Sequence, residues 1–188
     1  MPKAVFLDRD GTIIEDRGHL RCPSEAVFFP DTFDALRRLQ EEFLLFIVTN
    51  QSGIAKRLIT RQDADRVNHC VVRRLAEAGI RIADVYVCPH QRADGCPCIK
   101  PKGYFLEAAA ARYGIELACS FTVGDHPHDV ELADRVGAQG IYVLTGHGEK
   151  HRNELATGAI VAQGIGDAAR KILRAPTSRM EPRKPSDI

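Results

Sequence analysis

Short apolar runs alternate along the chain with segments whose apolar residues recur every three or four positions. Runs that are apolar at consecutive positions are typical of strands buried on both faces of a parallel sheet. The clearest runs lie at 4–7, 44–48 and 121–123, and each ends abruptly in polar residues. Further strand-like runs lie at 84–87, 140–144 and 159–161. The pattern therefore predicts strands at these six places.

The segments between the runs have the spacing of amphipathic helices. Asp31 and Thr60 are expected to be the N-caps of two helices, and Gly79 is expected to end the second. Two more helices are expected over 104–113 and about 167–173. The apolar stripes of the first two helices, which we interpret as core packing, are Phe33, Leu36 and Leu39, then Val67, Cys70, Val71 and Leu75.

This alternation predicts an α/β fold, a three-layer, Rossmann-like parallel sheet with helices on both faces. The length of 188 residues suits one domain with a sizeable core, which we place at 1–174. One helix, one strand and a cysteine-rich loop account for the chain between Asn50 and Lys100, so we expect a minimal cap. Residues 175–188 carry three prolines among charges without periodicity, which predicts a disordered tail.

Two aspartates, Asp8 and Asp10, directly follow the first apolar run, and Gly11 and Thr12 come next. In a continuing strand their side chains would share one face, at the sheet edge where α/β proteins bind ligands. Carboxylates that close call for a hard cation such as Mg²⁺, for different protonation states, or for both. An Asp-Gly hairpin turn is the alternative, but residues 13–18 are a poor second strand because they are short and charged.

Other predicted strands also end in residues with useful chemistry. Thr49 and Asn50 follow the second run, Asp125 follows the run at 121–123, and Lys100 precedes a helical segment. Together with the first two aspartates, this set offers a nucleophile, an acid, metal ligands, phosphate-binding donors and a cation. Such an inventory suits phosphoryl transfer. Asp129 is either an outer contact of the metal site or a helix N-terminal residue stabilised by the helix dipole.

A second group of residues predicts a zinc site. Cys88, His90, Cys96 and Cys98 place four soft ligands within eleven residues, directly after a strand-like run. Such a set can close a tetrahedron around Zn²⁺ with no open position, which indicates a structural site. A disulfide is the alternative, and it is less favoured because we find no secretion signal. We expect the site to rigidify loop 88–98 and hold Lys100 against the active centre. Cys22, Cys70 and Cys119 are interpreted as free thiols.

In this order and strand context, four segments resemble the motifs of the haloacid dehalogenase (HAD) superfamily of phosphohydrolases. The segments are residues 8–12, 49–50, Lys100 and 124–125, and the likeness spans roughly residues 4–145. The resemblance implies that Mg²⁺ is bound by the carboxylates of Asp8 and Asp125 and by the backbone carbonyl of Asp10. Thr49 and Asn50 would hydrogen-bond the phosphoryl group, and Lys100 would offset its charge.

We expect Asp8 to attack phosphorus and form an aspartyl-phosphate. Asp10 would protonate the leaving alkoxide and later deprotonate the water that hydrolyses this intermediate. A phosphate-binding protein that had lost turnover would be expected to lack one of the two aspartates, and both are present. A zinc module that recruits a macromolecule would need more exposed basic or aromatic residues around the cysteines.

Residues 50–55 and the Cys-x-His, Cys-x-Cys and Lys-Pro elements resemble one branch of the superfamily, the heptose bisphosphate and histidinol-phosphate phosphatases. The resemblance implies a small, nearly capless, Mg²⁺-dependent enzyme with a structural zinc loop. The heptose enzymes remove the 7-phosphate of D-glycero-D-manno-heptose 1,7-bisphosphate, a step toward the lipopolysaccharide core. Histidinol phosphate, or another small sugar phosphate, is the alternative substrate.

The chain departs from this branch at two positions. Ile99 stands where the branch usually has arginine, and His126 stands where the heptose enzymes tend to have lysine. An arginine fork or an ammonium that could bind phosphate is therefore replaced. Lys56, Arg57 or Lys102 could compensate for these losses.

Composition narrows the range of partners. A net charge of +1 gives no bulk attraction to nucleic acid or membrane, and we find no apolar run long enough to span a bilayer. A small phosphorylated metabolite is the expected partner. The chain begins its first strand at once, without a cleavable hydrophobic segment. We therefore expect a cytoplasmic protein, and we expect it to be a monomer.

Overall fold

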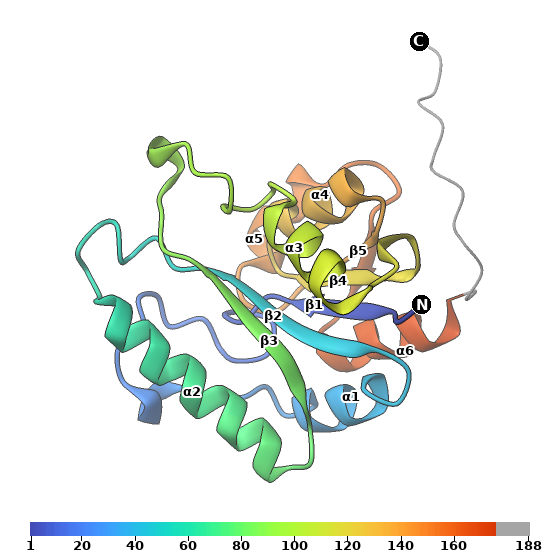
Figure 1. Ribbon diagram of the computed structural model, residues 1–188, viewed down its shortest axis with the longest axis horizontal. Coiled ribbons are helices and arrows are strands. Elements are labelled where there is room, and N and C mark those ends of the chain that lie inside the picture. The colour runs from blue at the N-terminus through green and yellow to red at the C-terminus, as the bar shows by residue number, and fades with distance from the viewer. Residues whose placement is uncertain (176–188) are drawn as a thin grey trace.

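A six-stranded parallel sheet forms the centre of the molecule (Figure 1). The computed structural model describes residues 1–175. The strands lie in the order β3-β2-β1-β4-β5-β6, and all five neighbouring pairs are parallel. The strands are β1 (Ala4–Leu7), β2 (Leu44–Asn50), β3 (Ile82–Cys88), β4 (Phe121–Gly124), β5 (Gln139–Val143) and β6 (Ile160–Ala162). The predicted three-layer parallel fold is confirmed.

Helices cover both faces of the sheet (Figure 1). Side chains of α1, α2 and α6 pack in one apolar cluster, and those of α3 and α4 pack in another on the opposite face. The helices are α1 (Thr32–Leu39), α2 (Arg61–Glu77), α3 (Tyr104–Tyr113), α4 (Pro127–Val136), α5 (Gly148–His151) and α6 (Ile165–Arg174). Short 3₁₀ turns lie at Pro23–Glu25, Arg92–Asp94, Leu117–Cys119 and Arg152–Glu154.

Consecutive apolar residues form strands here because each strand serves both cores. In β1, Val5 and Leu7 point into the cluster beneath α1, α2 and α6, whereas Phe6 points into the other. The ring of Phe6 stacks on that of Phe46 in β2, with centroids 5.1 Å apart. Alternate side chains therefore enter opposite layers, and neither face of the central strands meets water.

The two predicted helix caps differ in outcome. Thr60 caps α2 as expected, because its hydroxyl accepts a hydrogen bond from the Asp63 amide in a capping box. Asp31 precedes α1, but its side chain makes no cap there. Its carboxylate instead accepts a hydrogen bond from the Gly166 amide at the start of α6. Asp31 therefore links α1 and α6, which lie side by side in one layer.

Several predicted bounds shift by a few residues. Strand β3 begins two residues earlier than the predicted run, and α6 also begins two residues early, at Ile165. The last turn of each element is fixed by packing and hydrogen bonds that a local pattern does not contain. Most of the predicted tail, 176–188, lies outside the described residues. Within residues 1–175, the helices are all too short or too polar to cross a membrane.

The topology gathers the predicted polar residues at one edge of the sheet. The strand order reverses between β1 and β4, so their carboxyl ends form a crevice. The Asp8 amide donates to the Val123 carbonyl across this junction at 2.8 Å. Asn50, at the end of β2, is in register with Cys88, at the end of β3. The cysteine-rich loop and the β1 aspartates therefore meet at the same edge.

Candidate active site

A cavity of about 260 Å³ opens at the carboxyl edge of the sheet. Loops that follow four of the six strands contribute to its walls. Every residue predicted to act in phosphoryl transfer lines it, and the lining is rich in aspartate. The lining residues are Asp8, Asp10, Asp16, Thr49, Asn50, Arg92, Ile99, Lys100, Asp125, His126, His128 and Asp129.

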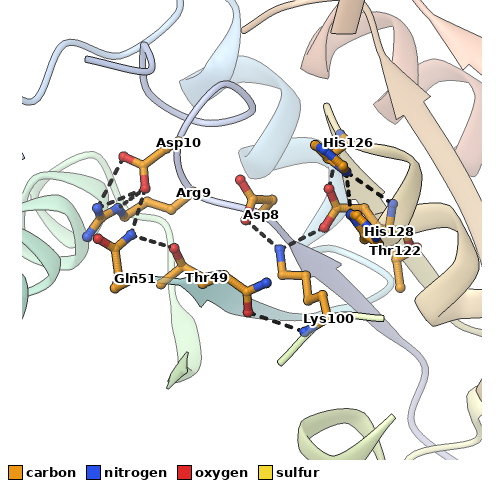
Figure 2. A network of polar contacts seen from close by, with 11 residues as sticks. Asp8, Arg9, Asp10, Thr49, Gln51, Lys100, Thr122, His126 and His128 are labelled. Carbon is orange, nitrogen blue, oxygen red and sulfur yellow. Dashed lines mark hydrogen bonds and ion pairs between the residues drawn. The ribbon is translucent and has the colours of Figure 1, made fainter. Parts of the chain in front are cut away.

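Lys100 lies between two carboxylates on the floor of this cavity (Figure 2). Its Nζ atom is 2.5 Å from Asp8 Oδ1 and 2.7 Å from Asp129 Oδ1, and only 5% of its surface is exposed. Burial alone would lower the pKa of Lys100, but the charges of Asp129 and Asp8 outweigh it and raise that pKa. Burial raises the pKa of Asp8, and the neighbouring aspartates add to the rise. The ammonium therefore stays charged and orients Asp8.

Asp10 is held by a different set of donors. Arg9 is fully buried, and its Nε and Nη2 atoms donate to the Asp10 carboxylate at 3.1 and 2.8 Å. Gln51 Nε2 donates to the same carboxylate at 2.8 Å, and Arg9 Nη1 reaches Asn68 Oδ1 in α2. These contacts turn the Asp10 side chain toward Arg9, so the two aspartates have separate hydrogen-bond partners (Figure 2).

Thr49 and Asn50 end β2 beside these carboxylates. The Thr49 hydroxyl accepts a hydrogen bond from Gln51 Nε2 at 2.8 Å. Asn50 Oδ1 accepts a bond from the Lys100 amide at 3.3 Å, which leaves the Asn50 side-chain NH₂ available to a ligand. Asn50 therefore also fixes the backbone from which the Lys100 side chain projects.

Asp125 ends β4 in a nest made by two glycines. A Cβ atom placed on Gly11 would lie 2.1 Å from Asp125 Oδ2, and one on Gly146 would lie 2.2 Å from it. The His147 amide donates to the same oxygen at 2.7 Å. Burial raises the pKa of Asp125 to about 6, despite this hydrogen bond. The loop after β5 thus contacts Asp125.

Asp129 has the helix N-terminal role, one of the two that the sequence left open, and it also binds Lys100. It lies at the third position of α4. Its Oδ2 atom accepts a hydrogen bond from the His126 amide at 3.2 Å, as is typical of a carboxylate at a helix N-terminus. Its other oxygen binds Lys100. A Cβ atom on Gly124 would lie 2.1 Å from the Asp129 side chain, so glycine is required there. Asp129 therefore joins the start of α4 to Lys100 on the floor of the cavity.

Imidazoles and one guanidinium form the rim of the cavity. The rings of His126 and His128 stack with centroids 4.3 Å apart, and Arg92 Nη2 contacts the ring nitrogens of His128. Burial lowers the pKa of His126 to about 4, helped by the neighbouring His128 ring. Burial and the charge of Arg92 lower the pKa of His128. Both imidazoles are therefore neutral near pH 7.

The four predicted zinc ligands come together at one point. Their ligand atoms all lie within 4.8 Å of one another, and the three Sγ–Sγ distances are 3.4, 3.6 and 3.6 Å. His90 Nδ1 lies 3.8 Å from Cys88 Sγ and 3.5 Å from Cys98 Sγ. A tetrahedron with Zn–S bonds of about 2.3 Å has edges of about 3.8 Å. The Cys₃His set therefore fits a closed zinc site, and all six cysteines are free of disulfides.

The donors at the sheet edge also fit the other expected metal. Asp8 and Asp125 offer carboxylate oxygens from neighbouring strands, and their negative charges interact. Mg²⁺ prefers hard oxygen ligands of this kind, together with water and phosphate oxygens. The residues present are therefore suited to hold Mg²⁺ between the ends of β1 and β4.

Sequence reasoning identified the cavity residues that are expected to react, but it missed the residues that orient them. Arg9, Gln51 and Asn68 were not singled out. One signal for Arg9 was available in the sequence. Arg9 lies between Asp8 and Asp10, so in an extended chain its side chain points to the opposite face, and it is buried in the protein. A buried arginine needs an anionic partner, and Asp10 is adjacent.

A parallel sheet that ends in this aspartate and lysine arrangement defines the HAD-like class of hydrolases. A family model described as HAD-hydrolase-like matches residues 97–168. A Neisseria meningitidis serogroup B protein named D-glycero-beta-D-manno-heptose-1,7-bisphosphate 7-phosphatase is 32% identical over 182 residues. That match covers 94% of this chain and 97% of the relative. A Thermoplasma volcanium protein, named as a probable heptose bisphosphatase, is 37% identical over 71% of this chain and 93% of its own.

A solved structure agrees with these relatives. The crystal structure of the D,D-heptose 1,7-bisphosphate phosphatase of Bordetella bronchiseptica, complexed with magnesium and phosphate, superposes with a TM-score of 0.84. The two are 31% identical, and the match covers 92% of this chain and 98% of that one. The chain belongs to the HAD superfamily of phosphatases, in the family that includes these heptose bisphosphatases. The expected class of enzyme is confirmed.

Proposed function

We propose that this protein hydrolyses the 7-phosphate of D-glycero-D-manno-heptose 1,7-bisphosphate. One observation carries the chemistry: the Asp8 carboxylate lies on the cavity floor with Lys100 Nζ 2.5 Å away. The names of the relatives support the choice of substrate. A sugar phosphate has the size and charge that a small, polar, open cavity can admit.

Asp8 acts as the nucleophile in this proposal. One of its oxygens attacks phosphorus, the bond from phosphorus to the sugar oxygen breaks, and an aspartyl-phosphate forms. Lys100 neutralises charge on the transferring group from its fixed position, and Thr49 and Asn50 supply hydrogen bonds to its oxygens. Asp129 holds Lys100 on the side away from Asp8.

Asp10 carries the proton between the two halves of the reaction. It donates a proton to the departing sugar oxygen and then takes one from the water that attacks the aspartyl-phosphate. That attack breaks the bond between phosphorus and Asp8 and releases inorganic phosphate. Arg9 and Gln51 orient the Asp10 carboxylate for both transfers.

Two metals belong to the proposal. Asp8, Asp125 and the backbone carbonyl of Asp10 would hold Mg²⁺, which supplies positive charge next to the phosphoryl oxygens. Cys88, His90, Cys96 and Cys98 would hold Zn²⁺ as a structural ion. Lys100 follows the last of these ligands by two residues, so the zinc loop would fix its backbone. A cytoplasmic location and a monomeric state remain predictions.

Histidinol phosphate is the second candidate substrate, and one observation favours it. Asp16 lines the cavity, and a carboxylate there could bind the ammonium group of that substrate. Ile99 would offer an apolar contact beside it. A heptose bisphosphate carries no cationic group, so Asp16 could only accept hydrogen bonds from its hydroxyl groups.

The test is phosphate release from heptose 1,7-bisphosphate, from histidinol phosphate and from an aryl phosphate, with and without Mg²⁺. We expect the heptose substrate to have the highest kcat/KM. Asp8→Asn should lower its turnover at least about a thousandfold, because the amide is a far weaker nucleophile. Asp34→Asn, an exposed substitution in α1, is the matched control and should leave turnover unchanged.

Three results would count against parts of this proposal. Faster hydrolysis of histidinol phosphate would replace the substrate and leave the chemistry intact. Turnover that survives in Asp8→Asn would exclude Asp8 as the nucleophile. An absence of turnover on every phosphate in the presence of Mg²⁺ would overturn the activity itself.

A further inference from the structure

Arg92 is a cation at the mouth of the cavity, and it forms no ion pair with a carboxylate among residues 1–175. The lining contains five aspartates and two cationic side chains, Arg92 and Lys100. Lys100 is engaged by two carboxylates on the floor. The recorded contacts of the Arg92 guanidinium, among residues 1–175, are with the ring nitrogens of His128, and the side chain is exposed. Its charge is therefore available to an anion that enters the cavity.

The other basic residues near the site are not available in this way. Lys102 Nζ donates to the carbonyls of Gly95 at 3.1 Å and Cys96 at 2.6 Å, so it stabilises the cysteine loop. Lys56 and Arg57 are exposed but do not line the cavity. Lys56, Arg57 and Lys102 were the residues that could compensate for the basic side chains absent at Ile99 and His126. Lys102 binds the cysteine loop instead.

The backbone holds Arg92 in a defined place. It begins the 3₁₀ turn Arg92–Asp94, between His90 and Cys96 of the cysteine cluster. The Asp94 side chain accepts the Gln91 amide at 3.0 Å, and the Asp94 amide donates to the Gln91 carbonyl. Both ends of the segment are tied to the cluster, so the guanidinium projects from a braced loop toward α4.

The remaining rim residues are apolar or already in contact with another ring. Ile99 is apolar, and the His126 ring stacks on that of His128 with centroids 4.3 Å apart. His128 can donate one ring N–H when neutral, and its ring already lies against Arg92. Arg92 therefore supplies the positive charge at the rim of this aspartate-rich cavity, and His128 lies beside it as a neutral ring.

We propose that Arg92 and His128 bind a second phosphate group of the substrate, distinct from the one that Asp8 attacks. This inference rests on the proposed function and deepens it, because it assigns a preference for bisphosphates over monophosphates to two residues of this chain. The guanidinium fork matches phosphate oxygens, and an incoming phosphate would exchange the imidazole contact for a charged one. Arg92 is thus a specificity-determining residue, separate from the groups that transfer phosphorus.

The experiment compares two substrates that differ only in the second phosphate, heptose 1,7-bisphosphate and heptose 7-phosphate. For each variant, the preference is the ratio of their kcat/KM values. Arg92→Gln should lower this preference about tenfold or more, mainly through the KM for the bisphosphate, as expected for one charge-assisted contact. Arg92→Lys should keep part of it. Arg73→Gln, which removes an exposed arginine paired with Glu77 on α2, is the matched control.

A binding measurement separates this inference from the proposed reaction. Calorimetry on Asp8→Asn and on Asp8→Asn/Arg92→Gln would report affinity for both sugars without turnover. We expect the double variant to lose about tenfold in affinity for the bisphosphate and much less for the monophosphate. Zinc content measured for each variant checks that the loop remains folded.

The outcomes are distinct. If Arg92→Gln keeps the parental preference in both assays, the assignment of the second phosphate to Arg92 is wrong. If the parent hydrolyses neither sugar but binds the bisphosphate through Arg92, the proposed reaction fails while the subsite stands. If the parent binds both sugars equally, the preference itself is absent and the inference is overturned.

Discussion

The placement of Asp125 depends on two glycines, because any larger residue at either position would occupy the space of its carboxylate. Gly11 and Gly146 approach its carboxylate from two loops, and neither position has room for a methyl group. A Cβ atom on Gly146 would also lie 2.4 Å from the Gly11 Cα atom. Because both loops are in contact through Asp125, a small change in either one moves a proposed Mg²⁺ ligand.

Gly146→Ala should therefore weaken Mg²⁺ binding. We expect the Mg²⁺ concentration for half-maximal activity to rise about tenfold, because the new methyl displaces Asp125 Oδ2. Titration of activity with Mg²⁺ measures this. Gly114→Ala is the control: it has a similar positive φ of 67°, but no atom lies within 4 Å of its Cβ position.

Both variants should lose about 1–2 kcal/mol of stability, since a side chain at positive φ is strained. Only Gly146→Ala should change the metal requirement. Equal Mg²⁺ titrations in the two variants would show that the nest around Asp125 does not govern metal binding.

At the scale of single residues, the proposed reacting groups could be predicted from the sequence, whereas the residues that orient them could not. Asp8, Lys100 and Asp125 could be predicted because they follow apolar runs, and strand ends share one edge. The pairing of Arg9 with Asn68 joins residues 59 positions apart, and no local pattern contains it. The contact between His147 and Asp125 is hidden for the same reason.

The cysteine loop connects three structural elements. It begins at the last residue of β3, which is in register with Asn50 of β2, and it ends just before Lys100 and α3. The Gln51 amide donates to the Cys88 carbonyl, and the Ala55 amide donates to the Pro89 carbonyl. These two hydrogen bonds join the cysteine loop to the loop after β2, so the proposed zinc site would brace that loop as well as the lysine.

Cys96→Ser should remove the zinc and loosen this brace. Metal analysis of the parent protein should give about one Zn²⁺ per chain, and the variant should retain little. We expect Tm to fall by about 10 °C, because metal binding in such a loop is coupled to folding. Turnover should fall together with Tm, since Lys100 loses its fixed backbone.

Cys22→Ser supplies the comparison. Cys22 is exposed and lies outside the cluster, so its substitution should leave zinc content, Tm and turnover unchanged. A Cys96→Ser protein with full zinc content would refute the Cys₃His assignment.

At the scale of elements, whether a segment forms a helix or a strand was easier to predict than the residues at which it begins and ends. The six strands and the helices at 104–113 and from Thr60 follow from apolar periodicity and one capping residue. Asp31 shows the limit of such reasoning, since an aspartate before a helix is a typical N-cap. Its carboxylate instead binds Gly166, 135 positions away, because α1 and α6 pack side by side.

The whole molecule concentrates negative charge at one edge of its sheet. Asp10, Asp125 and Asp129 each raise the pKa of Asp8 by repulsion, after the larger effect of burial. Lys100 offsets part of this charge. The fold thus gives up stability at its active edge, as buried like charges do in general.

Binding of a divalent cation should offset the repulsion among these aspartates and so stabilise the folded protein. At a Mg²⁺ concentration of 100 times Kd, binding contributes about 2.7 kcal/mol. For a chain of this size, we expect Tm to rise by about 5–10 °C. Differential scanning fluorimetry measures this rise in Tm with MgCl₂. NaCl at equal ionic strength gives the part of the rise that is due to ionic strength alone. Asp125→Asn should remove most of the rise, and a rise that persists in that variant would place the ion elsewhere.

The architecture itself was the easiest feature to predict. Alternating strands and helices admit few topologies, since parallel strands need crossover helices on the two faces. The order of the strands and the register of Asn50 with Cys88 were not predictable, because they depend on pairings between distant segments.

The braced loop that carries Arg92 also has a consequence for how such an enzyme can diverge. Residues 91–95 lie between His90 and Cys96, so the proposed zinc ligands would fix both ends of the segment. Substitutions within it would alter the rim while the strand ends keep their geometry. New substrates could therefore arise by mutation at Arg92, the residue of this segment that lines the cavity, without loss of the proposed phosphoryl transfer.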